Sequence, residues 1–317
     1  MENYAGDGKY EEEYVVNTRG VKLFTCRWLP EKVEPRALIF LCHGYAMECS
    51  ISMRDCATRL VKAGYEVHGI DCEGHGKSSG LQGLVSSFDD LVDDLSEHFT
   101  NICERRENKK KMRIIMGESM GGAMALRLHR KKPEYWDGAI LVAPMCKIAE
   151  EMRPHPMAIK LLPFLTRIIP TWKITPTPDI VDNAFRDPHV REEVRSNPYT
   201  HKGRPRLQTS HQLYLASLDL EKRLHEVSLP FIVLHGEEDK VTDPSVSKLL
   251  YESACTIDKT LKLYPQMWHS LSYGELPENL NIVFSDILEW LEHRVFAYDA
   301  KLEEHKKLAN DRDVSKT

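Results

Sequence analysis

The residues with the clearest capacity for chemistry lie in the segment 117–121, which reads Gly-Glu-Ser-Met-Gly. A Gly-x-Ser-x-Gly motif places a serine in a sharp turn between a strand and a helix, where side chains at the flanking positions would not fit. An apolar run, Arg113–Met116, precedes the motif, and a helical pattern, Gly121–Lys132, follows it. This context predicts that Ser119 projects its hydroxyl as a nucleophile, with the amino-terminal end of the helix behind it.

A serine hydroxyl becomes a good nucleophile when a base takes its proton, and an acid in turn orients that base. In hydrolases with this motif, the order along the chain is serine, acid, histidine. Asp239 follows the apolar run Phe231–Leu234, and His269 follows a later strand-like run, Thr260–Tyr264. We therefore predict that Asp239 is the acid and His269 is the base.

Other acidic and basic candidates fit these roles less well. Asp243 precedes a proline at the start of a predicted helix, so we interpret it as a helix cap. Glu237 and Glu238 are interpreted as solvent-exposed. The remaining downstream histidines end a strand, fall in a proline-rich helical segment, or lie on the last helix or tail. They are His189, His201, His211, His225, His235, His293 and His305.

Acyl transfer also needs hydrogen-bond donors for the oxygen on which negative charge develops. The backbone N–H of Met120, directly after the nucleophile, is predicted as one donor. Tyr45 is predicted as the other, because it lies in a loop after an early strand and Gly44 lets the chain turn tightly there. We interpret His43 and His75 as residues that order their loops rather than as metal ligands. No metal or cofactor is predicted.

The elements that must hold these residues alternate between strand and helix. A predicted hairpin, Glu13–Pro30, comes first, and a helical pattern at Glu278–Arg294 closes the chain. The alternation predicts a mostly parallel α/β sheet with helices on both faces. The strand runs between these ends are Ala37–Cys42, Tyr65–Asp71, Arg113–Met116, Ala139–Ala143, Phe231–Leu234 and Thr260–Tyr264, and the helical patterns include Met53–Lys62, 88–102 and Gly121–Lys132.

The alternation stops between Cys146 and Val227, where the sequence is rich in prolines and mostly helical. We therefore predict one α/β core, residues 10–146 and 227–296, interrupted by a helical cap at 147–226. The ends, residues 1–9 and 297–317, are polar and are predicted to be flexible tails.

The cap contains an apolar run, Met157–Trp172, which two prolines interrupt. The run is apolar around more than one helix face, so packing against the core does not use all of it. We predict that part of it faces the substrate, with Leu162, Leu165 and Ile169 as binding residues, or contacts a membrane surface. The alternative is that the run only packs the cap onto the core.

Composition narrows the function classes further. Among 317 residues, 43 Lys plus Arg oppose 48 Asp plus Glu, and this small net charge of −5 argues against a nucleic-acid partner. The start lacks the pattern of a secretory signal, and no apolar stretch is long enough to span a bilayer. Eight cysteines are too few for a disulfide scaffold and lack zinc-site spacing. We predict a cytoplasmic protein with free thiols, with peripheral membrane contact left open.

Taken together, the motifs resemble the plant monoacylglycerol lipase group of serine α/β-hydrolases, which also includes caffeoylshikimate esterases. The resemblance covers roughly residues 10–294 and implies an α/β-hydrolase fold with a lid near 147–226. It implies the same roles for Ser119, Asp239 and His269, and an oxyanion hole at Tyr45 and Met120. Ala46 stands where that group often has glycine. The motifs that carry the resemblance are His43–Glu48, Gly74–Ser78, Gly117–Gly121, His235–Asp239 and Met267–His269.

From these residues we expect a serine carboxylester hydrolase that acts through an acyl-serine intermediate. The expected substrate is a small ester, a monoacylglycerol cleaved to fatty acid and glycerol. The alternative substrate is caffeoyl shikimate or another phenolic ester. Alternatives of another class are a ligand-binding receptor, which a broken triad would favour, and an acyltransferase, which differs in the acceptor that attacks the acyl-enzyme.

Overall fold

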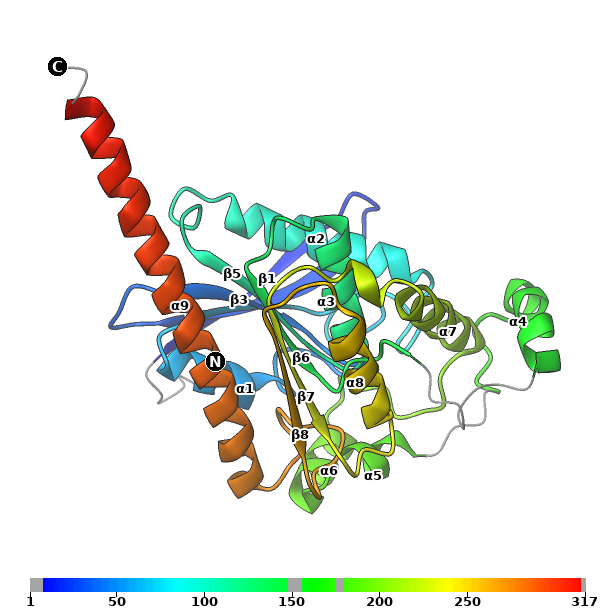
Figure 1. Cartoon of the computed structure of the whole chain (residues 1–317). Helices are drawn as coiled ribbons and strands as arrows, with labels where there is room; N and C mark the ends of the chain where they lie inside the picture. The colour runs from blue at the N-terminus through cyan, green and yellow to red at the C-terminus, as the bar shows by residue number, and fades with distance from the viewer. Residues whose placement is uncertain (1–7, 148–155, 175–178, 315–317) are drawn as a thin grey trace.

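The computed structural model describes residues 8–147, 156–174 and 179–314. Its centre is an eight-stranded sheet with helices on both faces (Figure 1). The strand order is β1-β2-β4-β3-β5-β6-β7-β8. Strand β2 pairs antiparallel with β1 and β4, and the other neighbours pair in parallel. The predicted mostly parallel α/β sheet is therefore confirmed. The strands are β1 (Gly8–Val16), β2 (Lys22–Pro30), β3 (Ala37–Cys42), β4 (Glu66–Ile70), β5 (Met112–Glu118), β6 (Gly138–Val142), β7 (Phe231–Gly236) and β8 (Lys259–Tyr264).

The central strands are apolar throughout because both faces of the sheet are covered. In β3 all six residues are buried. Leu38 and Phe40 point into one core cluster, whereas Ile39 and Leu41 point into the other, as the twofold repeat of a strand requires.

Helices cover the two faces separately (Figure 1). On one face, α2 (Phe88–Cys103), α3 (Met120–Lys131) and α8 (Pro244–Ser253) contribute to the first core cluster. On the other face, α1 (Arg54–Lys62) and α9 (Pro277–Val314) contribute to the second. Their apolar residues recur at helical spacing, as Leu91, Leu95 and Phe99 of α2 show.

Most of the predicted tail, residues 297–314, is helical and belongs to α9. The helix continues to Val314, and Figure 1 shows its last part projecting beyond the sheet. Tyr298 still contacts the body, since its hydroxyl donates to the carbonyl of Lys110 at 3.3 Å. Beyond that point the sequence is polar but contains no glycine or proline, and its Ala, Leu, Glu and Lys residues favour helix. At the other end, β1 begins at Gly8, and residues 1–7 lie outside the described residues.

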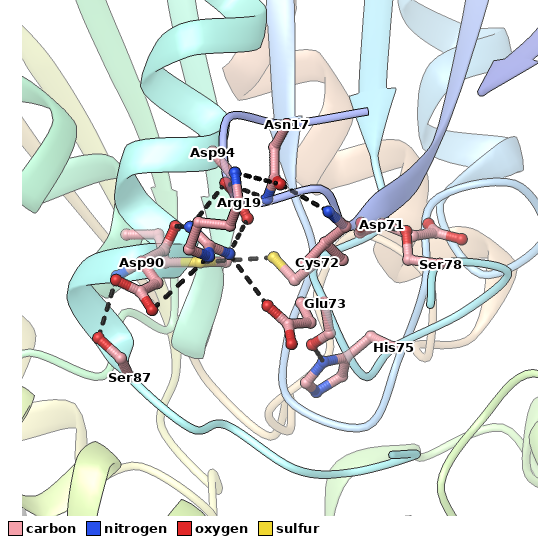
Figure 2. A network of polar contacts seen from close by, with 12 residues as sticks. Asn17, Arg19, Asp71, Cys72, Glu73, His75, Ser78, Ser87, Asp90 and Asp94 are labelled. Carbon is pink, nitrogen blue, oxygen red and sulfur yellow. Dashed lines mark hydrogen bonds and ion pairs between the residues drawn. The ribbon is translucent and has the colours of Figure 1, made fainter. Parts of the chain in front are cut away.

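A partly buried polar network fixes the turn of the first hairpin to the body (Figure 2). The Arg19 guanidinium donates to both carboxylate oxygens of Asp94 in α2, at 3.0 and 2.8 Å, and Asn17 donates to the same carboxylate at 2.8 Å. Arg19 also reaches Glu73, at 3.0 Å, in the glycine-rich loop after β4. This loop and the loop after β3 lie together at the carboxyl ends of the strands. The network therefore helps to order the edge of the sheet at which the predicted site residues lie. Cys72 of that loop donates its backbone N–H to Nε2 of His43 at 3.0 Å, in keeping with a loop-ordering role for this histidine.

Between β6 and β7 the described residues form helices and no strand. Helix α7 packs on α2 and α3, and α4 packs on α7 at the outer edge of the molecule (Figure 1). Two contacts join this segment to the loop after β3: His201 donates its backbone N–H to the carbonyl of Ala46 at 2.9 Å, and Asn197 donates to the Glu48 carboxylate at 3.2 Å. The helices are α4 (Pro156–Ile168), α5 (Ile180–Ala184), α6 (Pro188–Ser196) and α7 (Leu207–Glu221), followed by a 3-10 turn, Leu224–Glu226.

The helices and the cysteines bear on the predictions about membrane spans and disulfides. Among the described residues, none of the helices combines the length and the apolar character needed to cross a bilayer. All eight cysteines are free thiols, and seven of them are buried.

Candidate active site

Ser119 occupies the turn between β5 and α3 that the sequence predicts. Its backbone has φ 57° and ψ −117°, a left-handed conformation that costs a residue with a side chain about 1–3 kcal/mol. The turn is also too close to β3 for side chains at the motif's glycines. A Cβ at Gly121 would lie 1.9 Å from the carbonyl oxygen of Cys42, and one at Gly117 would lie 2.2 Å from that of Gly121. The close contact holds the serine above the carboxyl ends of the strands.

Asp239 and His269 come together from the loops after β7 and β8. Nδ1 of His269 lies 2.7 Å from Oδ2 of Asp239, and both side chains are buried. Burial lowers the pKa of His269, but the neighbouring Asp239 carboxylate outweighs burial, so the pKa lies above the ordinary value for histidine. Burial likewise raises the pKa of Asp239, and the two imidazoles beside it reverse that effect and hold the pKa well below its ordinary value.

The second of those imidazoles belongs to His235, which the sequence analysis set aside as the end of a strand. Its Nε2 lies 2.9 Å from Oδ2 of Asp239, and its Nδ1 lies 2.7 Å from the hydroxyl of Ser247. The backbone N–H groups of Val241 and Thr242 donate to Oδ1 at 2.7 and 3.0 Å. Asp239 is thus held on both oxygens. The His-x-x-x-Asp spacing that begins at the end of β7 is the signal that could have identified His235.

The other acidic candidates lie where the sequence analysis placed them. Oδ1 of Asp243 accepts the backbone N–H of Ser245 at 2.7 Å, so this residue caps α8 as predicted. Glu237 and Glu238 are exposed to solvent. These observations leave Asp239 as the carboxylate in contact with His269.

Ser119 and His269 line the same cavity, which has a volume of about 540 Å³. Its core side includes Gly44, Tyr45 and Met120, and its cap side is formed by α5, α6 and α7. The cap side carries both apolar and charged side chains. The apolar ones are Ile180, Val181, Ala184, Phe185, Val194 and Leu213, and the charged ones are Lys147, Asp179, Arg195, Lys202 and Arg204.

The two predicted oxyanion donors lie on the core side of this cavity. A Cβ built on Gly44 would lie 3.6 Å from Cβ of Ser119, which places the loop of Tyr45 beside Ser119. Within the described part of the chain, the backbone N–H groups of Tyr45 and Met120 form no hydrogen bond. Ala46 adopts φ 67°, which accounts for the glycine often found at this position in the resembling group.

The cap residues predicted to bind substrate do not lie in this cavity. Leu162, Leu165 and Ile169 are half-buried beside α7, and the cavity lining excludes them. The structure does not bring these three residues to this cavity, because an apolar run identifies a helix but not the neighbour that each face meets. The face of α4 exposed to solvent is a different one, formed by Leu161, Phe164 and Ile168 and continued by Trp172.

Comparison with known proteins agrees with this arrangement. A model of the Hydrolase_4 family, described as serine aminopeptidase S33, matches residues 33–276. The chain is 32% identical to caffeoylshikimate esterase of Arabidopsis thaliana, over 95% of this chain and 91% of the relative. It is 30% identical to monoglyceride lipase of Mus musculus, over 90% and 92%. A soluble variant of monoglyceride lipase from Saccharomyces cerevisiae, solved in complex with a substrate analog, shares the fold with a TM-score of 0.80 at 22% identity, over 93% of this chain and 98% of that one.

The contact between Asp239 and His269 can be tested without an activity assay. Replacing Asp239 with Asn removes the negative charge that opposes the effect of burial, so the pKa of His269 should fall. NMR titration of the His269 ring measures this pKa. Asp243→Asn is the matched control, because Asn caps a helix as well as Asp does. An unchanged or raised pKa in Asp239→Asn would contradict the assigned contact.

Proposed function

The chain belongs to the Hydrolase_4 family of serine hydrolases and is a serine ester hydrolase, and we propose that it cleaves monoacylglycerols through an acyl-Ser119 intermediate. The observation that carries the proposal is the cavity itself. Ser119 and His269, which contacts the buried side chain of Asp239, line its core side, and six apolar side chains of the cap line it as well. Such a cavity suits a substrate with one reactive ester and a long apolar chain.

In the proposed reaction, Nε2 of His269 takes the proton of the Ser119 hydroxyl as the oxygen attacks the ester carbonyl. Asp239 holds the imidazole through Nδ1 and stabilises the positive charge that forms on it. The N–H groups of Tyr45 and Met120 stabilise the negative charge on the carbonyl oxygen. His269 then gives its proton to the leaving glycerol oxygen, and a water activated by the same imidazole releases the fatty acid.

The base must be neutral to accept the serine proton. Since the pKa of His269 is raised, activity should be present above that pKa and be lost as the pH falls through it.

The role of Ser119 is tested by Ser119→Ala. Turnover of a soluble ester should fall by about 10⁴- to 10⁶-fold, because nucleophile, base and acid act as a unit. A fluorophosphonate probe should label the wild type and not the variant. Labelling of another residue, or unchanged turnover, would contradict the assignment and would favour a ligand-binding receptor.

The acyl chain is proposed to lie against the cap side of the cavity. Each methylene that leaves water there contributes up to about 0.8 kcal/mol, which gives at most a roughly fourfold rise in kcat/KM per methylene. In a series of monoacylglycerols, kcat/KM should therefore rise with chain length and then reach a plateau.

Two leucines of α7 provide the matched pair for this test. Leu213 lines the cavity, and Leu215 lies in the same helix but is exposed and does not line it. Leu213→Ser should flatten the chain-length slope and spare short soluble esters, whereas Leu215→Ser should keep the wild-type slope. Equal slopes in all three proteins would contradict this placement of the acyl chain.

A second candidate substrate is a phenolic ester of an acidic alcohol, such as caffeoyl shikimate. The 32% identical relative supports it, and so do two cations of the cap. Lys202 and Arg204 line the cavity, are exposed, and form no ion pair within the described residues, so they could meet a carboxylate on the leaving group. A flat chain-length profile together with fast cleavage of caffeoyl shikimate would favour this candidate over the lipase.

We further propose a cytoplasmic protein that contacts membranes through the exposed face of α4. The free cysteines suit a reducing compartment. Phe164 and Ile168 are each 62% exposed and Trp172 is 57% exposed, so this apolar face has no cover from the described residues. Apolar faces of this kind insert into the boundary of a bilayer, where a monoacylglycerol is found.

The membrane contact is tested with phospholipid vesicles. Phe164→Glu should weaken co-sedimentation with the vesicles and slow hydrolysis of vesicle-bound monoacylglycerol, with turnover of a short soluble ester unchanged. Ile257→Glu is the control, since Ile257 is 99% exposed and lies between α8 and β8. Equal vesicle binding by both variants and the wild type would rule out this face as the contact.

A further inference from the structure

Glu118, the residue before the nucleophile, makes a contact that the proposed reaction does not use. It ends β5, is half-buried and lines the cavity beside Ser119. Its Oε1 accepts the hydroxyl of Ser270 at 2.6 Å, and its Oε2 accepts the hydroxyl of Ser272. One carboxylate thus binds two serines that lie more than 150 positions away in the chain.

Both serines belong to the loop that carries His269. They are buried, with 1% and 3% of their surface exposed. The same loop is held by Trp268, whose backbone N–H donates to the Glu275 carboxylate at 2.5 Å, and by Ser270, whose N–H donates to the carbonyl of Ala184 at 3.1 Å. These two contacts tie the loop to itself and to α5. Glu118 ties it to the strand that ends at the nucleophile.

The carboxylate also acts on His269 through its charge. Among the described residues, the groups that face this imidazole or its partners are Asp239 and, behind it, His235, both from the loop and strand end of β7. Glu275 follows on the loop itself, with Arg186 of the cap 3.8 Å from its carboxylate. Burial lowers the pKa of His269. The Asp239 carboxylate raises this pKa most, and the Glu118 carboxylate raises it further.

We propose that Glu118 is a positioning residue, which fixes the loop of His269 to the turn of Ser119 and places a second negative charge behind the base. The proposal rests on the roles of Ser119 and His269 given under the proposed function. A carboxylate suits this position because its two oxygens accept two hydroxyl protons at once. A half-buried charge near a second carboxylate adds little to the stability of the fold, so the effect of Glu118 on the His269 imidazole is the better reason for its presence.

Two variants separate the tether from the charge. Glu118→Gln keeps the size and most of the hydrogen bonding but removes the charge. The acid limb of kcat/KM against pH should then move to lower pH, because His269 loses a neighbour that raises its pKa. The double variant Ser270→Ala plus Ser272→Ala keeps the charge and removes the tether. Its kcat should fall by roughly 10- to 100-fold with KM little changed, since the base is less well placed in the transition state.

Glu237→Gln is the matched control, because Glu237 carries the same charge at the same edge of the sheet but is exposed to solvent. It should keep the wild-type pH profile and kcat. Thermal unfolding and stoichiometric fluorophosphonate labelling show whether each variant is folded with Ser119 reachable.

The proposal is overturned if Glu118→Gln keeps the acid limb of the wild type and the double serine variant keeps kcat within about twofold. It is also overturned if Glu237→Gln shifts the acid limb as much as Glu118→Gln does. Either result leaves the proposed function intact, because that function fails on a different observation, unchanged turnover by Ser119→Ala.

Discussion

The arrangement of the site depends on the close contact between two backbones, that of Gly121 at the start of α3 and that of Cys42 at the end of β3. With no Cβ at Gly121, the turn of Ser119 can lie against β3, which a side chain would push away. The contact brings Ser119 beside Gly44 and Tyr45, so two loops distant in sequence form one wall of the cavity. The strained backbone of Ser119 is tolerated because β5, β3 and α3 are buried around it.

The second requirement is a carboxylate that stays charged inside the protein. The side chain of Asp239 is buried, and a carboxylate buried alone would take up a proton rather than remain ionised. Here two backbone N–H groups, the hydroxyl of Thr242 and two imidazoles surround its oxygens. Those partners offset the loss of water, and the charge that remains keeps His269 oriented and more basic. His235 therefore matters to the proposed base, His269, although of the two it contacts only the proposed acid, Asp239.

The sequence predicts the strands, the elbow and the acid–base contact because each leaves a local pattern. The buried runs of β3 and β7 are continuous in apolar residues, and the loops after them carry the polar groups. Features that depend on contacts between distant parts of the chain could not be predicted in this way. Neighbours from other elements determine what His235 and Glu118 contact and which face of α4 is covered. The continuation of α9 was missed for a different reason, since its helical propensity is present in the sequence but its polar composition suggested a tail.

The central claim is that Ser119, His269 and the N–H groups of Tyr45 and Met120 converge on one carbonyl carbon. A crystal structure of the protein after reaction with an alkyl phosphonate ester measures this directly, since the phosphorus copies the tetrahedral carbon of the reaction. The account predicts phosphorus bonded to Oγ of Ser119, with its free oxygen within hydrogen-bond distance of both N–H groups and the alkyl chain against α7. An adduct on another residue, or a free oxygen turned away from Tyr45 and Met120, would contradict it.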